Sequence, residues 1–147
     1  MPPKPVKPIE PITIRPIGTA TARAVPTRAG ARPALLTVTL RLELQCGQPG
    51  LLPITVVLPA AERVPRSISP DDVVVNGRAV RSLSLIGHVV VLTLPRTSGI
   101  NCYAIAPGLL TVQFLRRAGL GNPTEPATYR ISIRRGSTSA VARLIIV

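Results

Sequence analysis

The chain has 147 residues, a length suited to one domain, and its composition already excludes several classes of protein. Hydrophobic residues make up 46% of the sequence but aromatic residues only 2%, so any core must be aliphatic. Its Val, Ile, Leu and Thr suit half-buried sheet, and its 17 prolines interrupt helices, so the composition predicts an all-β fold. The longest apolar runs have the length of strands and are broken by Arg, Pro or Gly, so we expect no membrane-spanning helix.

The formal net charge of +12 comes from 18 basic and 6 acidic residues. An excess of this kind can indicate a polyanionic partner, namely nucleic acid, an anionic membrane or an acidic cell-wall polymer, although a solvated, arginine-rich surface explains it more simply. Proteins that bind single-stranded nucleic acid add aromatic stacking platforms, and this chain has two Tyr, one Phe and no Trp. The composition therefore disfavours nucleic acid as the partner.

Residues 1–33 differ from the remainder, because they hold eight of the 17 prolines and the isoleucines Ile9, Ile12, Ile14 and Ile17. Proline favours extended backbone and excludes this segment from a central strand. We expect an extended N-terminal arm over 1–33 and a domain over 34–147. The arm is either a flexible linker or an added strand on a sheet, of its own chain or of another copy.

From residue 35 onward, short apolar runs recur at regular spacing. In Leu36–Leu44 every second residue is apolar, which indicates a strand with one buried face. Asn76-Gly77 between apolar runs is a strong hairpin signal. The pattern predicts a β-sandwich of seven to eight strands, or a barrel, with further strands over Leu51–Leu58, Asp72–Val75, Ala79–Leu85, His88–Leu94, Leu109–Leu115, Ala127–Ile133 and Ser139–Val147.

Two short motifs stand out from the general strand pattern. Asp-Val-x-Val-Asn-Gly lies in Ser69–Val80, a segment that continues through Gly87–Pro95, and Gly-x-x-Asn-Pro-Thr lies in Ala118–Ile133. In these elements the chain, over about residues 35–140, resembles an Ig-like β-sandwich module of bacterial cell-surface and S-layer-associated proteins. The resemblance implies a secreted or envelope-located structural domain with no catalytic residues. The chain departs from such modules in being arginine-rich, in having two cysteines and in standing alone, and these departures favour a self-assembling subunit over a spacer.

Cys46 and Cys102 each lie in a Gly- or Pro-containing loop just before an apolar strand. A single disulfide is the economical interpretation and implies an oxidising or extracellular compartment. A bond within the chain would add roughly 3–4 kcal/mol in the chain-entropy model. A bond between subunits and two unconnected buried thiols are the alternatives.

Two further positions could carry chemistry. His88 is the one histidine, and a general base there needs a nucleophile or carboxylate that the sequence does not identify, so we interpret it as a polar residue at a strand end. Asp71-Asp72 could contribute to a Ca²⁺ site, but Ser69-Pro70-Asp71-Asp72 more simply forms a turn. We therefore expect no enzyme activity, no cofactor and no metal.

The chain ends in Leu144, Ile145, Ile146 and Val147, strand-forming residues with no charge after them. An exposed edge of this kind pairs readily with another chain. The alternative is an ordinary last strand within its own sheet.

Together these features predict a bacterial, extracellular or cell-surface structural subunit. Its arm would join copies into a filament or surface layer by donor-strand-like exchange. The alternative is an adhesin or wall-attachment module that binds acidic polymers through arginine. Met1-Pro2-Pro3-Lys4 leads into prolines, so we expect no signal peptide in this chain.

Overall fold

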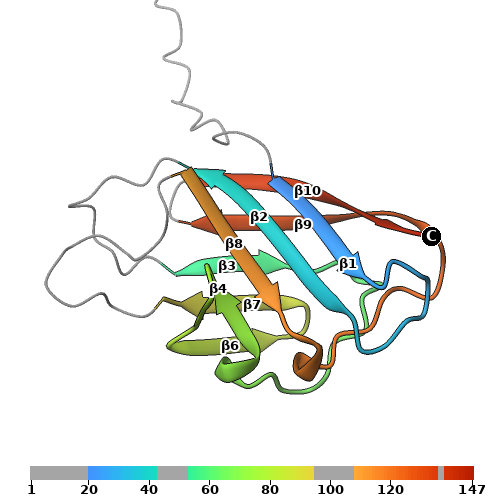
Figure 1. Cartoon of the computed structure of the whole chain (residues 1–147), viewed down its shortest axis with the longest axis horizontal. Coiled ribbons are helices and arrows are strands. Elements are labelled where there is room, and N and C mark those ends of the chain that lie inside the picture. Colours follow the sequence, from blue (N-terminus) through green and yellow to red (C-terminus); the bar gives the residue numbers. More distant parts are fainter. Residues whose placement is uncertain (1–19, 43–52, 95–107, 136–137) are drawn as a thin grey trace, which may run out of the picture.

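The computed structural model describes residues 20–42, 53–94, 108–135 and 138–147, and these residues form a β-sandwich (Figure 1). Two antiparallel sheets contain five strands each, so the predicted all-β sandwich is confirmed. The first sheet has the order β1 (Ala20–Val25), β2 (Leu35–Leu42), β8 (Gly108–Phe114), β4 (Val73–Val75), β5 (Arg78–Ala79). The second has the order β10 (Thr138–Ile146), β9 (Ala127–Arg135), β3 (Ile54–Val57), β7 (Val89–Thr93), β6 (Ser82–Ile86).

Two short 3-10 helices, η1 (Pro70–Asp72) and η2 (Arg116–Ala118), complete the regular structure of the described residues. Among those residues, no helix has the length and apolar character needed to cross a membrane.

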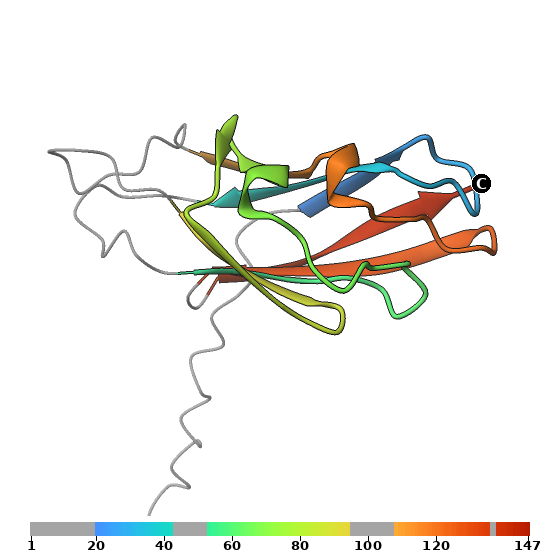
Figure 2. The ribbon, with the colours of Figure 1, turned by 90° about the horizontal axis from the view of Figure 1, so that it is seen from below.

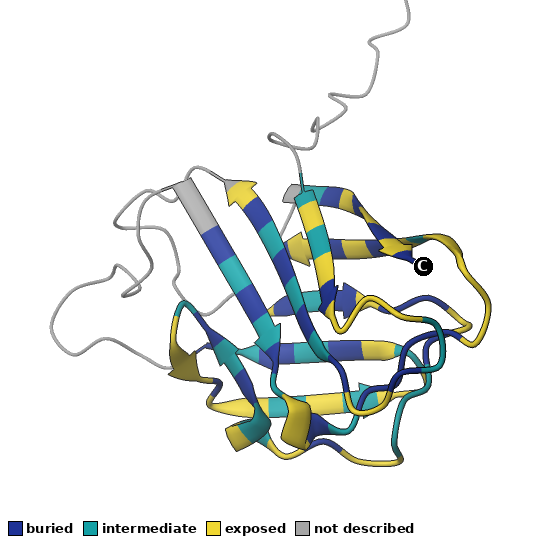
Figure 3. Ribbon diagram, turned by 45° about the vertical axis from the view of Figure 1, so that its right-hand side comes forward, coloured by how far each residue is buried: buried dark blue, intermediate teal, exposed yellow. Residues whose placement is uncertain are grey.

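The two sheets form separate layers with the core between them (Figure 2). Alternate residues of each strand point inward, and buried and exposed positions alternate along the strands accordingly (Figure 3). In β2 the buried residues are Leu36, Val38 and Leu40, as the sequence pattern predicts. The core is aliphatic apart from Phe114, which is fully buried on β8.

The Asn76-Gly77 hairpin is confirmed between β4 and β5. Both turn residues have positive φ, 49° for Asn76 and 83° for Gly77, as a tight hairpin turn requires. The Asn76 side-chain oxygen also accepts a hydrogen bond from the Thr111 N–H of β8 at 2.7 Å. This bond attaches the turn to β8, the strand beside β4 in the same sheet.

The strand predicted over Ala79–Leu85 is instead two strands in different sheets. Val80 is buried, and its N–H donates to the Val73 carbonyl of the first sheet at 3.1 Å. The next N–H, of Arg81, donates to the Thr93 carbonyl of the second sheet at 2.8 Å. The chain therefore crosses from one layer to the other at this point, where Arg81-Ser82 also interrupts the alternation between Val80 and Leu83.

The predicted domain boundary at residues 33–34 is wrong, because β1 lies within the predicted arm. Ala20–Val25 pairs with β2 over its whole length, from Ala20 opposite Leu40 to Val25 opposite Leu35. The segment was assigned to the arm because prolines flank it, at residues 16 and 26. Together, β1 and the divided strand explain why the described residues contain ten strands and not seven or eight.

Candidate functional site

The side of the sandwich formed by β1 and β10 is the candidate functional site. β1 is the outermost strand of the first sheet and β10 the outermost strand of the second. Within the described residues, β1 pairs with β2 alone, and β10 of the second sheet packs close to β1 without pairing with it. Unpaired strand edges are templates for the addition of another strand.

An open groove of about 630 Å³ follows β1. Its wall includes β1 from Thr21 to Val25, the outward-facing Thr37 and Thr39 of β2, and Ile145 of β10. The lining is threonine, alanine and aliphatic side chains with one charge, Arg23. A charge at the middle of an edge strand is also a common protection against unwanted pairing.

The C-terminal residues lie at this same side. Leu144 and Ile146 are buried, whereas Ile145 and Val147 are exposed. At the end of the chain, the outer edge of Val147, the residue after β10, is covered by the loop that follows β1. The Val147 N–H donates to the Thr27 carbonyl at 3.0 Å, and the Ala29 N–H donates to the Val147 carbonyl at 2.9 Å.

Asn122 holds that loop in place and was not recognised from the sequence beyond its place in a turn. It is fully buried, and its side-chain amide donates to the carbonyls of Pro26 at 2.7 Å and Arg28 at 2.9 Å. Its own N–H donates to the Ala31 carbonyl at 2.9 Å. The Asn-Pro-Thr motif thus fixes the chain directly after β1 and thereby the end of the candidate site.

The predicted arm residues Ile9, Ile12, Ile14 and Ile17 lie outside the described residues, as do Cys46 and Cys102. The strands that flank the two cysteine loops are described. The last residue of β2, Leu42, pairs with the first residue of β8, Gly108. Both loops therefore leave the sandwich at the same end.

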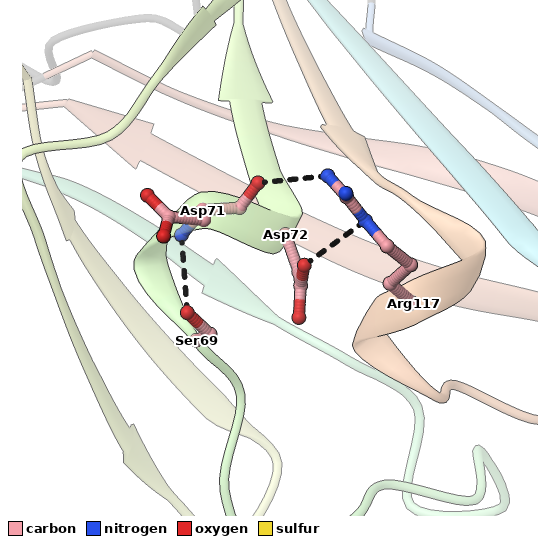
Figure 4. A network of polar contacts seen from close by, with 4 residues as sticks. All are labelled: Ser69, Asp71, Asp72 and Arg117. Carbon is pink, nitrogen blue, oxygen red and sulfur yellow. Dashed lines mark hydrogen bonds and ion pairs between the residues drawn. The ribbon is translucent and has the colours of Figure 1, made fainter.

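Asp71 and Asp72 form a turn that leads into β4, as the sequence predicts (Figure 4). The Ser69 hydroxyl caps the turn by accepting from the Asp71 N–H at 3.3 Å. Arg117 of η2 forms an ion pair with Asp72 at 3.3 Å and donates to the Asp71 carbonyl at 3.4 Å. These contacts join η1 to η2, so Asp71 and Asp72 have a structural role.

His88, in the turn between β6 and β7, contacts the backbone of Glu62. The His88 Nε2 lies 2.9 Å from the Glu62 carbonyl oxygen. The Glu62 side chain is 3% exposed, and neither carboxyl oxygen has a hydrogen-bond partner among the described residues. Burial without such a partner raises the pKa of the Glu62 carboxyl from 4.5 to about 7. Sequence pattern gave no signal for this residue, because acidic side chains are seldom buried.

The chain matches no family model and no curated protein sequence. It is similar in structure to BslA, described as a bacterial hydrophobin, with a TM-score of 0.57 and 14% sequence identity. The similarity covers 88% of this chain and 97% of that one. At this level of identity the likeness shows a shared fold.

Proposed function

We propose that the chain is a non-enzymatic structural protein of the bacterial cell surface, which assembles with other copies of itself. The observation that carries the proposal is the unpaired edge of β1, with its groove, placed directly after the isoleucine-containing segment. The description of a structural neighbour as a bacterial hydrophobin supports a surface-associated role.

The Ig-like subtype of the sandwich is part of this proposal, and two features support it. The orders β1-β2-β8-β4 and β10-β9-β3 match A-B-E-D and G-F-C of immunoglobulin domains when β8, β9 and β10 are taken as E, F and G. The Tyr129 hydroxyl donates to the Glu125 carbonyl at 2.7 Å, near the start of β9, as in the tyrosine corner of that fold. The hairpin β6–β7 after β4 is a departure from it.

The arm is proposed to add a strand along β1 of another copy. Pro11 and Pro16 lack an N–H, so a strand that contains them fits only at the outside of a sheet. The four residues between them, Ile12 to Arg15, retain every N–H and alternate apolar with polar side chains. Pairing within one chain would need a tight turn at Gly18-Thr19, whereas pairing with a second copy needs none.

The test is the assembly state of the full chain and its variants, by analytical ultracentrifugation and negative-stain microscopy. The truncation must end at residue 18, because β1 begins at Ala20. Deletion of residues 1–18 and the double substitution Ile12→Ser, Ile14→Ser should both give a monomer. The conservative pair Thr13→Ser, Arg15→Lys should assemble like the unchanged chain.

The acceptor edge is tested separately by Thr21→Lys, which places a charge in the groove beside β1. We expect it to prevent assembly, while Thr124→Lys adds the same charge at an exposed loop position and leaves assembly intact. A full chain that is monomeric at all concentrations would refute self-assembly. A truncated chain that forms the same particle would refute the role of the arm.

A second candidate function is attachment to an acidic wall polymer. It is favoured by the exposed arginines that both sheets present, Arg23 and Arg41 on the first and Arg130, Arg134 and Arg143 on the second. This candidate predicts a monomer whose retention on an anionic glycan falls as salt rises.

A further inference from the structure

The outer face of the second sheet carries a row of five exposed residues, four of them aliphatic, that crosses all five strands. The pairing register places Val141 of β10 opposite Ser132 of β9, Ser132 opposite Val57 of β3, Val57 opposite Val89 of β7, and Val89 opposite Ile86 of β6. Directly opposed residues of antiparallel strands point to the same face. The row therefore has four aliphatic members and one serine.

These side chains are exposed to an unusual degree for their type. Ile86 is 76% exposed and Val141 55%, while Val57 and Val89 are 38% and 37% exposed. With strands about 4.8 Å apart, the row spans roughly 19 Å. Ile145, 61% exposed, lies on the same face of β10, separated from Val141 by Arg143. Isolated apolar residues at a surface need no explanation, but a group aligned on one face, here interrupted by Ser132, is typical of an interaction surface.

Arginines flank the row on the same face. Arg130 and Arg143 lie two positions from Ser132 and Val141, directly opposite each other in the register, and Arg134 lies on the other side of the row. Like charges in directly opposed positions destabilise a sheet unless an anion lies between them. The described residues of this outer face include no Asp or Glu.

We propose that this face binds an anionic lipid surface, with the aliphatic row entering the apolar boundary and the three arginines meeting the headgroups. Charge decides between the possible occupants. A second copy stacked on this face would oppose three arginines to three arginines with no acid between them. An acidic glycan would satisfy the arginines but leave the aliphatic row in water. An anionic lipid surface satisfies both features.

The test is co-sedimentation of the full chain with vesicles of phosphatidylcholine alone and with about one third phosphatidylglycerol added. The full chain should bind the mixed vesicles and not the neutral ones. The double variant Ile86→Thr, Val141→Thr keeps branched, strand-forming side chains and should bind at least tenfold more weakly. Val74→Thr removes a half-buried valine from the other sheet and should bind like the unchanged chain.

Arg130→Gln with Arg143→Gln provides an independent variant, which should lose binding to the mixed vesicles and gain thermal stability. Heparin is the control polyanion, because it offers charge without an apolar phase. The proposal is overturned if the Ile86, Val141 variant binds vesicles as well as the unchanged chain, or if the full chain ignores anionic vesicles. It is also overturned if the unchanged chain is a dimer and the Ile86, Val141 variant is a monomer, because a second copy then covers the row. The deletion of residues 1–18 should abolish assembly and preserve vesicle binding, so failure of either proposal is seen separately.

Discussion

At the scale of single residues, Glu62 shows how burial sets a protonation state. Its carboxyl is removed from water without a hydrogen-bond partner in the described structure, and its pKa rises to about 7. The folded protein therefore holds a proton that the unfolded chain releases above its ordinary pKa of 4.5. The contribution of Glu62 to stability is fully present below pH 4.5 and is lost as the pH rises to about 7.

The variant Glu62→Gln tests this. At about 1.4 kcal/mol per pKa unit, the shift corresponds to at most about 3.5 kcal/mol between the two limits. In urea unfolding at several pH values, the free energy of unfolding of the unchanged chain should decrease between pH 5 and 7. In the variant this decrease should be much smaller. Glu125→Gln replaces an exposed carboxyl and should keep the original slope. Parallel pH profiles for the unchanged chain and Glu62→Gln would contradict the assignment.

At the scale of elements, the β4–β5 hairpin depends on the backbone of Gly77. Its φ is +83°, and an added Cβ would meet no atom within 4 Å, so Gly77→Ala changes backbone strain with no clash. The left-handed conformation costs a residue with a Cβ about 1–2 kcal/mol, and the free energy of unfolding should fall by about that amount. Arg78→Ala, at an exposed position beside the turn, should change it by less than about 0.5 kcal/mol. Equal effects of the two substitutions in denaturant unfolding would mean that the turn conformation does not matter.

Sequence and structure agree best on elements whose signal is local. The alternation of Leu36–Leu44 predicts β2 with its buried face, and Asn76-Gly77 predicts the hairpin. β1 was missed, although its alternation of Ala20, Ala22 and Ala24 with larger side chains was a signal that could have found it. Alanine carries little apolar surface, so the flanking prolines outweighed that alternation.

At the scale of the whole molecule, the chain topology bears on the two cysteines. Leu42 and Gly108 are paired, Cys46 follows the first by four residues, and Cys102 precedes the second by six. Because a chain extends by at most about 3.6 Å per residue, these short sequence separations allow the two cysteines to meet near the Leu42–Gly108 pair. This arrangement favours a bond within the chain over a bond between subunits.

We therefore expect the oxidised protein to migrate as a single monomer band on denaturing, non-reducing electrophoresis, with a mass two hydrogen atoms below that of the reduced chain. The variant Cys46→Ser, Cys102→Ser should unfold at a lower denaturant concentration. Its free energy of unfolding should be lower by about 4 kcal/mol in the chain-entropy model. A ladder of covalent oligomers would instead establish a bond between subunits. An unchanged mass on reduction would mean two free thiols.

The amino-acid sequence by itself determined the all-β class, most strand positions, the aliphatic core and the turn at Asn76-Gly77. These follow from patterns with a period of two residues and from the backbone preferences of single residues, which operate over a few positions. The tertiary structure decided that β1 and β10 lie at the edges, that Glu62 is buried, and that Val57 lies between Val89 and Ser132 in one row. Strand order and register join residues far apart in the chain, because they depend on which faces bury together, and no local pattern encodes that choice.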